Sequence, residues 1–193
     1  PWLALAGQSV RALAEAAVAE GFEVLAADLF GDADTRRVAR GWRRLGDPAG
    51  ARFDAAVLHA LLRDVAAAGA VGWLAGGGFE AQAGLLDAGG SLLPLLGTAP
   101  ADQRRLRDAA AAFAALAAAE LPHPEVAWQR PADAGQWLVK TLRGCGGEQV
   151  RGWRAGESAL PPGHFTQRRV DGVPMSATFV ADGRQAELLG FNR

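Results

Sequence analysis

The first half of the chain alternates short apolar runs with alanine-rich segments of helical spacing, and this alternation limits the folds open to it. Four apolar runs predict buried strands, at residues 2–6, 22–27, 71–75 and 93–96. Apolar residues at helical spacing predict the helices between them, at residues 10–20, 53–68 and 79–88. Strands that alternate with helices in this way form a parallel sheet with helices on both faces. The sequence therefore predicts an α/β unit at the N-terminal side.

The pattern changes after about residue 98. One long alanine-rich helix is expected from Asp102 to Glu120, and the prolines that follow end it. Beyond it the chain reads as β structure, with candidate strands at 125–128, 136–141, 148–153, 164–170, 174–180 and 186–191. Asp182-Gly183 between the last two is a hairpin signal. We therefore expect two domains, residues 1–98 and 99–193.

Composition excludes several classes of protein. Half of the residues are hydrophobic and the net charge is −1, which is globular and unlike a dedicated nucleic-acid binder. A single cysteine rules out an internal disulfide framework and fits a reducing compartment, so a cytoplasmic location is expected. No apolar run is long enough to predict a membrane span. The arginine-rich stretch from Arg36 to Arg44 is expected to be a solvated helix face.

The segment from Trp137 to Val150 is the most informative for function. An apolar run ends in Lys140, a short loop with three glycines follows, and a second apolar strand begins. Glycines let a backbone approach a phosphate, and successive N–H groups in such a loop form an anion nest. A lysine at the strand end adds a mobile charge. No Gly-Lys-Ser/Thr opens a helix here, so this is not a Walker A loop. An ordinary hairpin with a glycine-rich turn is the alternative interpretation.

A second segment, from Gln167 to Gly183, combines a polar strand end, the turn Asp171-Gly172 and a return strand that begins near Ser176. Alone it reads as a simple hairpin. Together with the first segment it resembles the nucleotide-binding half of the ATP-grasp superfamily. The entry Leu121-Pro-His-Pro124 also resembles that family. The resemblance implies a Rossmann-like N-terminal (pre-ATP-grasp) domain, followed by the α+β first half of an ATP-grasp nucleotide-binding module.

The resemblance also assigns ATP-binding roles. Lys140 would contact the phosphates, and Arg107 stands where a second phosphate-binding lysine is often found. The glycine flap would be formed by Gly144, Cys145, Gly146 and Gly147. The hinge that holds the adenine and ribose would be formed by Gln167, Arg168, Arg169, Val170 and Asp171. Arg168 departs from the family, many members of which have a glutamate there.

The activity implied by the resemblance is that of a carboxylate–amine ligase that uses ATP and Mg²⁺ and forms an acyl phosphate. The subgroup it resembles is the predicted ATP-dependent carboligases, which include ligases similar to those that join glutamate to tyramine in methanofuran-type cofactor synthesis. A pathway to a methanofuran- or pterin-type one-carbon cofactor is therefore expected. The implied partners are ATP, a small-molecule carboxylate and an amine, with a homodimer as the assembly. Neither nucleic acid nor a membrane is expected as a partner.

The family's metal-binding pattern, "Asp-Phe … Glu-x-Asn-Pro-Arg", does not occur before Gly190-Phe-Asn192-Arg193. We therefore expect a chain truncated at its C-terminal side, with no metal ligand within it.

Two alternatives stay open: a non-catalytic nucleotide-binding protein of the same fold, and a nicotinamide-dependent oxidoreductase. The second would need a complete G-x-G-x-x-G, which Gly7-Gln8-Ser9 lacks. Gly76-Gly77-Gly78 reads equally well as a ligand loop or a tight turn.

Overall fold

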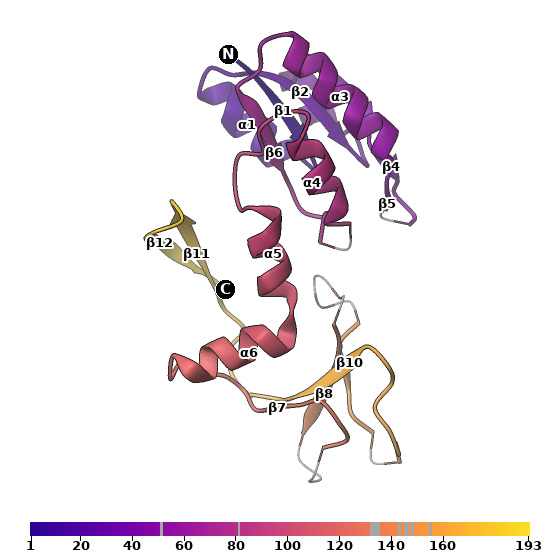
Figure 1. Ribbon diagram of the computed structural model, residues 1–193, viewed down its shortest axis with the longest axis vertical. Coiled ribbons are helices and arrows are strands. Elements are labelled where there is room, and N and C mark those ends of the chain that lie inside the picture. The colour runs from indigo at the N-terminus through magenta and orange to yellow at the C-terminus, as the bar shows by residue number, and fades with distance from the viewer. Residues whose placement is uncertain are drawn as a thin grey trace. The chain divides into compact units, whose positions relative to one another are not determined.

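The chain forms two compact units, Pro1–Arg104 and Arg105–Arg193 (Figure 1). The computed structural model describes residues 1–50, 52–80, 82–131, 136–142, 144, 147, 149–154 and 156–193. No helix among the described residues is long and apolar enough to cross a lipid bilayer.

The first unit is built on a four-stranded parallel sheet with the order β3-β2-β1-β6. Its strands are β1 (Trp2–Ala6), β2 (Glu23–Asp28), β3 (Gly41–Arg44) and β6 (Gly72–Ala75). Its helices are α1 (Arg11–Ala19), α2 (Ala33–Val38), α3 (Ala55–Ala67) and α4 (Gly84–Gly90). A short ribbon of β4 (Gly46–Asp47) and β5 (Arg52–Phe53) precedes α3. The predicted parallel α/β sheet is confirmed.

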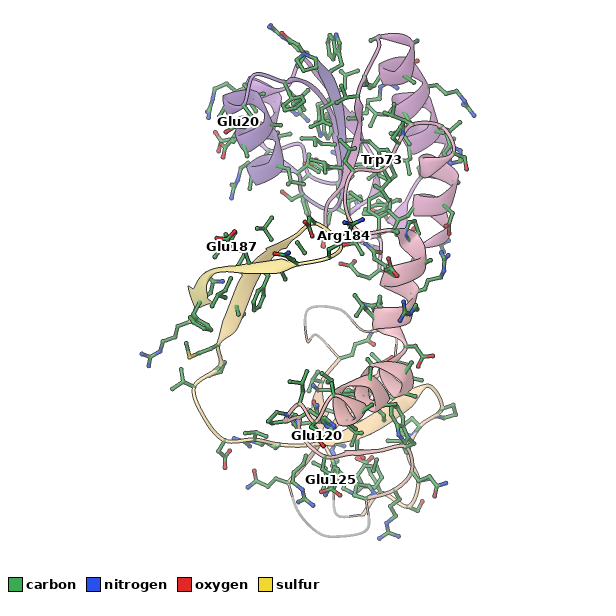
Figure 2. The ribbon with its side chains drawn as sticks, turned by 60° about the vertical axis from the view of Figure 1, so that its left-hand side comes forward. Glu20, Trp73, Glu120, Glu125, Arg184 and Glu187 are labelled. Atoms are coloured by element: carbon green, nitrogen blue, oxygen red, sulfur yellow. The ribbon has the colours of Figure 1, made fainter. Side chains whose placement is uncertain are left out.

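Two apolar clusters hold this sheet between its helices. One cluster joins α3 and α4 to the sheet around Trp73, which Figure 2 shows inside the first unit. The Trp73 and Phe79 rings pack with their centroids 5.8 Å apart, and Phe53 packs on Phe79 at 4.6 Å. The other cluster joins α1 to the opposite face through Val10 and Ala14. Each large side chain buried in this way stabilises the fold by about 1.5–3 kcal/mol.

Asp28, the last residue of β2, organises the edge of the sheet where the parallel strands end. Its carboxylate is fully buried. One oxygen accepts hydrogen bonds from the backbone N–H of Phe30 and Gly31, at 3.2 and 2.7 Å, and from the indole N–H of Trp42 at 2.9 Å. The other oxygen accepts from the N–H of Val10, at the start of α1, at 3.2 Å. One side chain therefore fixes β2, the loop after it, β3 and α1 together.

The second unit contains a four-stranded antiparallel sheet with the order β7-β10-β8-β9. Its strands are β7 (Val126–Ala127), β8 (Trp137–Thr141), β9 (Arg151–Gly152) and β10 (His164–Arg168). A separate hairpin joins β11 (Ser176–Ala181) to β12 (Ala186–Asn192), and Figure 2 labels Arg184 and Glu187 on it. The hairpin predicted from Asp182-Gly183 is confirmed. The backbone N–H groups of Gln185 and Arg184 hydrogen-bond the Asp182 carboxylate and lower its pKa.

The long helix predicted from Asp102 to Glu120 is wrong, because the chain forms two helices, α5 (Pro100–Arg107) and α6 (Ala109–Ala118). Asp108 lies between them with an extended backbone, and its carboxylate accepts a hydrogen bond from the N–H of Ala111 at 3.0 Å. An N-cap aspartate of this kind begins a new helix.

The arginine-rich stretch was also predicted wrongly as a helix face. Arg36 and Arg37 lie in the short helix α2, but Arg43 and Arg44 lie in strand β3. Other segments were predicted too long. Residues 93–96 contribute only an isolated bridge from Leu95 to Trp73, and the helix expected over residues 79–88 begins at Gly84.

We predict that Asp28→Ala lowers the free energy of unfolding by roughly 3 kcal/mol or more, because four N–H donors lose a charged, buried acceptor. Asp28→Asn should lower it less, since one acceptor oxygen remains. The measurement is urea unfolding followed by circular dichroism. Asp34→Ala is the matched control, since Asp34 forms an exposed ion pair with Arg37 and its loss should cost less than about 1 kcal/mol. Equal losses for the two alanine variants would contradict this role for Asp28.

Candidate functional site

Lys140 lies near the end of β8, on the same face of the sheet as residues of β10. The antiparallel register aligns Lys140 with Phe165 and Leu138 with Gln167, so these four side chains share one face. The ammonium group of Lys140 donates a hydrogen bond to the side-chain oxygen of Gln167. Lys140 is also the only lysine in the sequence. All the other residues of the combined lysine and arginine count are arginines.

A pocket of about 260 Å³ opens beside Lys140. Its lining combines the end of β8, the described glycines of the following loop, and β10: Lys140, Thr141, Gly144, Gly147, Gln149, Val150 and Phe165. Among the described residues that line the pocket, Lys140 is the one with a charged side chain. The pocket therefore presents one positive charge beside glycine backbone, an arrangement suited to a phosphate group.

Two glycines of the predicted flap are required by the backbone at this pocket. Gly147 has a φ of +78°, in the left-handed region. A Cβ on Gly144 would lie 2.6 Å from a methyl carbon of Thr141. A larger residue would therefore be strained by the backbone conformation at position 147 and would require Thr141 to shift at position 144. Cys145 and Gly146, also predicted for the flap, lie outside the described residues.

Arg107, at the end of α5, is tied to the same loop. Its guanidinium donates a hydrogen bond to the backbone oxygen of Gly144 at 2.9 Å. The structure thus brings Arg107, Lys140, Gly144, Gly147 and Gln167 together around one loop and one strand pair. These five residues come from the two sequence segments that were predicted to act together and from the helix before them.

The rest of the predicted hinge is placed differently. The side chain of Arg168 donates to the Glu125 carboxylate at 2.9 Å and lies over the Trp137 ring, 4.5 Å from its centroid. Arg169 pairs with Asp171 at 3.3 Å, and both side chains are exposed. Neither Arg168 nor the stretch 169–171 belongs to the described lining of the pocket. Their predicted contacts with adenine and ribose stay predictions.

The backbone of the hinge is partly committed to the sheet. The N–H of Arg168 donates to the oxygen of Glu125, and the N–H of Arg169 donates to the oxygen of Gln136, both at 2.8 Å. Adenine recognition by this segment would therefore have to use its carbonyl groups, or the N–H groups beyond Arg169.

Sequence reasoning missed the aromatic support beneath the pocket. Phe165 lines the pocket, and its ring centroid lies 5.4 Å from that of Trp128 and 6.0 Å from that of Phe113 in α6. Phe113 in turn packs on His123 at 5.4 Å. Helix α6 is therefore anchored to the sheet through the ring that floors the site. The apolar spacing of the sequence showed that Phe165 lies in a strand, but not which face it occupies.

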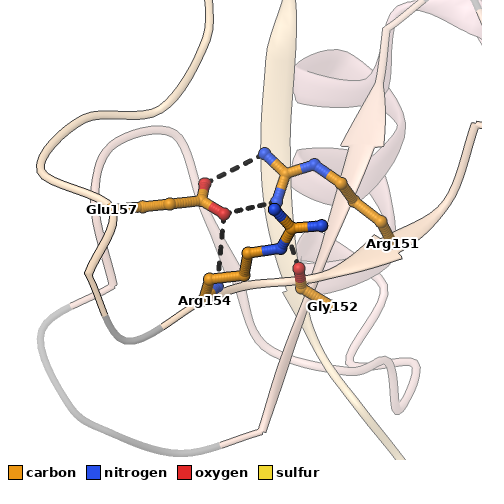
Figure 3. A network of polar contacts seen from close by, with 4 residues as sticks. All are labelled: Arg151, Gly152, Arg154 and Glu157. Carbon is orange, nitrogen blue, oxygen red and sulfur yellow. Dashed lines mark hydrogen bonds and ion pairs between the residues drawn. The ribbon is translucent and has the colours of Figure 1, made fainter.

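An ion pair fixes the chain just after the glycine loop. Arg151 makes a bidentate pair with Glu157, with distances of 2.6 and 2.9 Å, and Glu157 also accepts from the N–H of Arg154 at 3.3 Å (Figure 3). The hydrogen bond from Arg151 is the main cause of the lowered pKa of Glu157, and the same bond raises the pKa of Arg151. Strand β9 is thereby held to the segment that follows it.

Across the part of the chain that the structure describes, no three His, Cys, Asp or Glu side chains lie together in a way that could hold a metal ion. Among the described residues that line the pocket, the ammonium group of Lys140 is the charge available to a phosphate.

Comparison with known proteins identifies the fold. Residues 107–193 match a family model described as the ATP-grasp domain. The whole chain superposes on solved structures of that superfamily at low sequence identity. The chain has an ATP-grasp fold. No curated protein matches its sequence.

Three of the similar ATP-grasp structures illustrate the likeness. N5-carboxyaminoimidazole ribonucleotide synthetase from Thermotoga maritima matches 98% of this chain with a TM-score of 0.65 and 16% identity. The Staphylococcus aureus synthetase matches 98% with a TM-score of 0.69 and 14% identity, and L-amino acid ligase from Bacillus licheniformis matches 98% with 0.66 and 15%. The chain spans 52%, 53% and 49% of these proteins, about half of their length. The expected ATP-grasp fold class is confirmed.

We predict that Glu157 titrates below the usual range of a glutamate and that Arg151→Gln returns its pKa toward that range. Because the folded-state pKa is lowered, the pair stabilises the segment at pH values above the ordinary glutamate pKa. The stabilisation is lost as the pH falls through the folded-state value. The measurement is an NMR titration of the Glu157 side-chain carbonyl. An unchanged pKa in Arg151→Gln would contradict the assigned cause, and Arg184→Gln, on the hairpin, is the matched charge control.

Proposed function

We propose that this chain supplies the nucleotide-binding part of an ATP-dependent carboxylate–amine ligase. One observation carries the proposal: the only lysine of the sequence lines a pocket whose other walls include the two described flap glycines. An ammonium group and a backbone free of Cβ atoms are what a polyphosphate requires of its binding site. The ATP-grasp fold raises the expectation that the polyphosphate is ATP.

The reaction proposed is transfer of the γ-phosphoryl group of ATP to a substrate carboxylate. The bond between the γ-phosphorus and the bridging oxygen breaks, a carboxylate oxygen bonds to the phosphorus, and ADP leaves. An amine then attacks the acyl carbon, a C–N bond forms, and inorganic phosphate departs with the bonding electrons while the amine loses a proton. Catalysis of this kind depends on positioning and charge stabilisation.

The residues of this chain would act on the phosphate side of the reaction. Lys140 would exchange its hydrogen bond with Gln167 for a phosphate oxygen, or share the two acceptors among its three N–H donors. Arg107 would fix the loop through its hydrogen bond to the backbone oxygen of Gly144. Gln167 would keep the lysine on the pocket side of the sheet when no nucleotide is bound.

Finer assignments are also proposals. The carboxylate and amine are expected to be small molecules, and the subgroup resemblance favours biosynthesis of a one-carbon cofactor. A cytoplasmic location, which fits the single cysteine, and a homodimer are part of the same proposal. A second function, nucleotide binding without catalysis, is favoured by one observation, the lack of a metal-ligand cluster among the described residues. ATP hydrolysis dependent on a carboxylate and on Mg²⁺ separates the two functions.

We predict that Lys140→Ala weakens ATP binding at least tenfold, because a charge-assisted contact worth about 1.5–3 kcal/mol is lost. Lys140→Arg should recover part of the affinity, since it keeps the charge but changes the geometry of the donors. Calorimetric titration of the protein with ATP measures both effects.

The matched control is Arg184→Ala, which removes one positive charge from the exposed hairpin and should leave the ATP affinity within about twofold of the wild type. Unfolding curves of all three variants exclude loss of structure as the cause. An ATP affinity that is unchanged in folded Lys140→Ala would overturn the phosphate role of this pocket.

A further inference from the structure

The arginine-rich stretch in the first unit separates into two groups that the sequence does not distinguish. Three of its arginines form ion pairs with carboxylates: Arg37 with Asp34, Arg40 with Glu23, and Arg43 with Asp64. Within the described ranges of the chain, Arg36 and Arg44 form no ion pair with a carboxylate. Both instead lie against the ring of Trp42, with their guanidinium carbons 4.2 and 5.8 Å from its centroid.

Uncharged groups hold these two arginines in place. The ring of Trp42 is fixed by its hydrogen bond to Asp28 at 2.9 Å. Arg44 donates to the backbone oxygen of Leu29 at 3.1 Å, which uses one of its five N–H donors. Arg36 lies close to Gly31, where a Cβ would come within 2.9 Å of its terminal nitrogen. Gly31 has a φ of +64°, so the close approach and the backbone conformation both require glycine there.

The pair lies where an open parallel sheet binds ligands. Arg44 is the last residue of β3 and is aligned with Asp28, the last residue of β2. Arg36 belongs to α2, which follows β2 in the chain. Ligands of open α/β sheets bind outside the carboxyl ends of the strands, and these two residues lie at that edge of the sheet. Arg44 also borders an open pocket of about 660 Å³ whose lining includes a further arginine, Arg52, together with Asp47 and Asp54.

The charges around the pair leave room for an anion. The carboxylates of Asp47 and Asp54 accept hydrogen bonds from backbone N–H groups of their own turns. The buried carboxylate of Asp28 is occupied by four donors. Each planar guanidinium group carries N–H donors in a fixed fork, the geometry that carboxylates and phosphates bind most strongly.

We propose that Arg36 and Arg44, held on Trp42, form a binding site for the carboxylate or phosphate group of a small-molecule ligand. The site lies entirely within the first unit and does not depend on the nucleotide site proposed for Lys140. Its arginines bind an anionic group of the ligand, and the Trp42 ring is the partner that the two guanidinium groups share.

The test is an NMR titration of the whole chain with inorganic phosphate, and separately with succinate, at constant ionic strength set by sodium chloride. The indole N–H of Trp42 reports on the site. We expect saturable shifts with at least one of the two probes. The variant Arg36→Gln/Arg44→Gln should weaken that binding at least tenfold. The control Arg37→Gln/Arg43→Gln removes the same charge from the same stretch and should stay within twofold of the wild type.

Three results would overturn the proposal: no saturable shift with either probe, equal weakening in both double variants, or tight binding retained in Arg36→Gln/Arg44→Gln. If that variant does not fold, Arg36→Lys/Arg44→Lys replaces it. The lysine variant keeps both charges and loses the planar donors, so binding at least threefold weaker is expected, and wild-type affinity would contradict the site. A saturable response to phosphate alone or to succinate alone tells which anionic group the ligand carries.

Discussion

The antiparallel pairing of β8 with β10 is the constraint on which the candidate site depends. Its register places Lys140 beside Phe165 and within hydrogen-bonding reach of Gln167. A shift by one residue would turn Lys140 to the opposite face, because side chains alternate along a strand. The aromatic contacts of Phe165 with Phe113 and Trp128 oppose such a shift, since they bury apolar surface on one face only. The packing of Phe165, on the face that it shares with Lys140, thus helps to fix where the charge points.

The two proposed anion sites, one in each unit, are built in different ways. In the second unit, a lysine and glycine backbone supply a charge that can move and a surface free of Cβ atoms. In the first unit, the buried carboxylate of Asp28 fixes Trp42 through a hydrogen bond, and two guanidinium groups lie against the Trp42 ring. A mobile ammonium suits a group that is transferred, whereas fixed planar donors suit a group that is only recognised. In both arrangements, hydrogen bonds with neighbouring side chains hold the charged groups, or the ring they lie against, in position.

The sequence predicted the parts of the fold whose residues are buried on a regular period, such as β1, α1 and the Asp182-Gly183 hairpin. It failed at β3, because Gly41-Trp-Arg-Arg44 lies at the sheet edge and carries charges that resemble a helix surface. It failed at Asp108, because alanines on both sides hide a helix N-cap. For the site, spacing identified Lys140 and the flap, but the contact with Gln167 depends on strand register, which one sequence does not specify. The composition alone already distinguished Lys140, because the sequence has a single lysine among many arginines.

The central claim is that the ammonium group of Lys140 contacts the phosphates of ATP. Because Lys140 is the only lysine, an amine-reactive reagent can modify no side chain amine but this one. The measurement is the rate of Lys140 modification, followed by mass spectrometry, with saturating ATP, with AMP and without nucleotide, after calorimetry has established that ATP binds. The account predicts that ATP slows the reaction at least tenfold and that AMP, which lacks the β- and γ-phosphates, slows it much less. A rate that bound ATP leaves unchanged would contradict it.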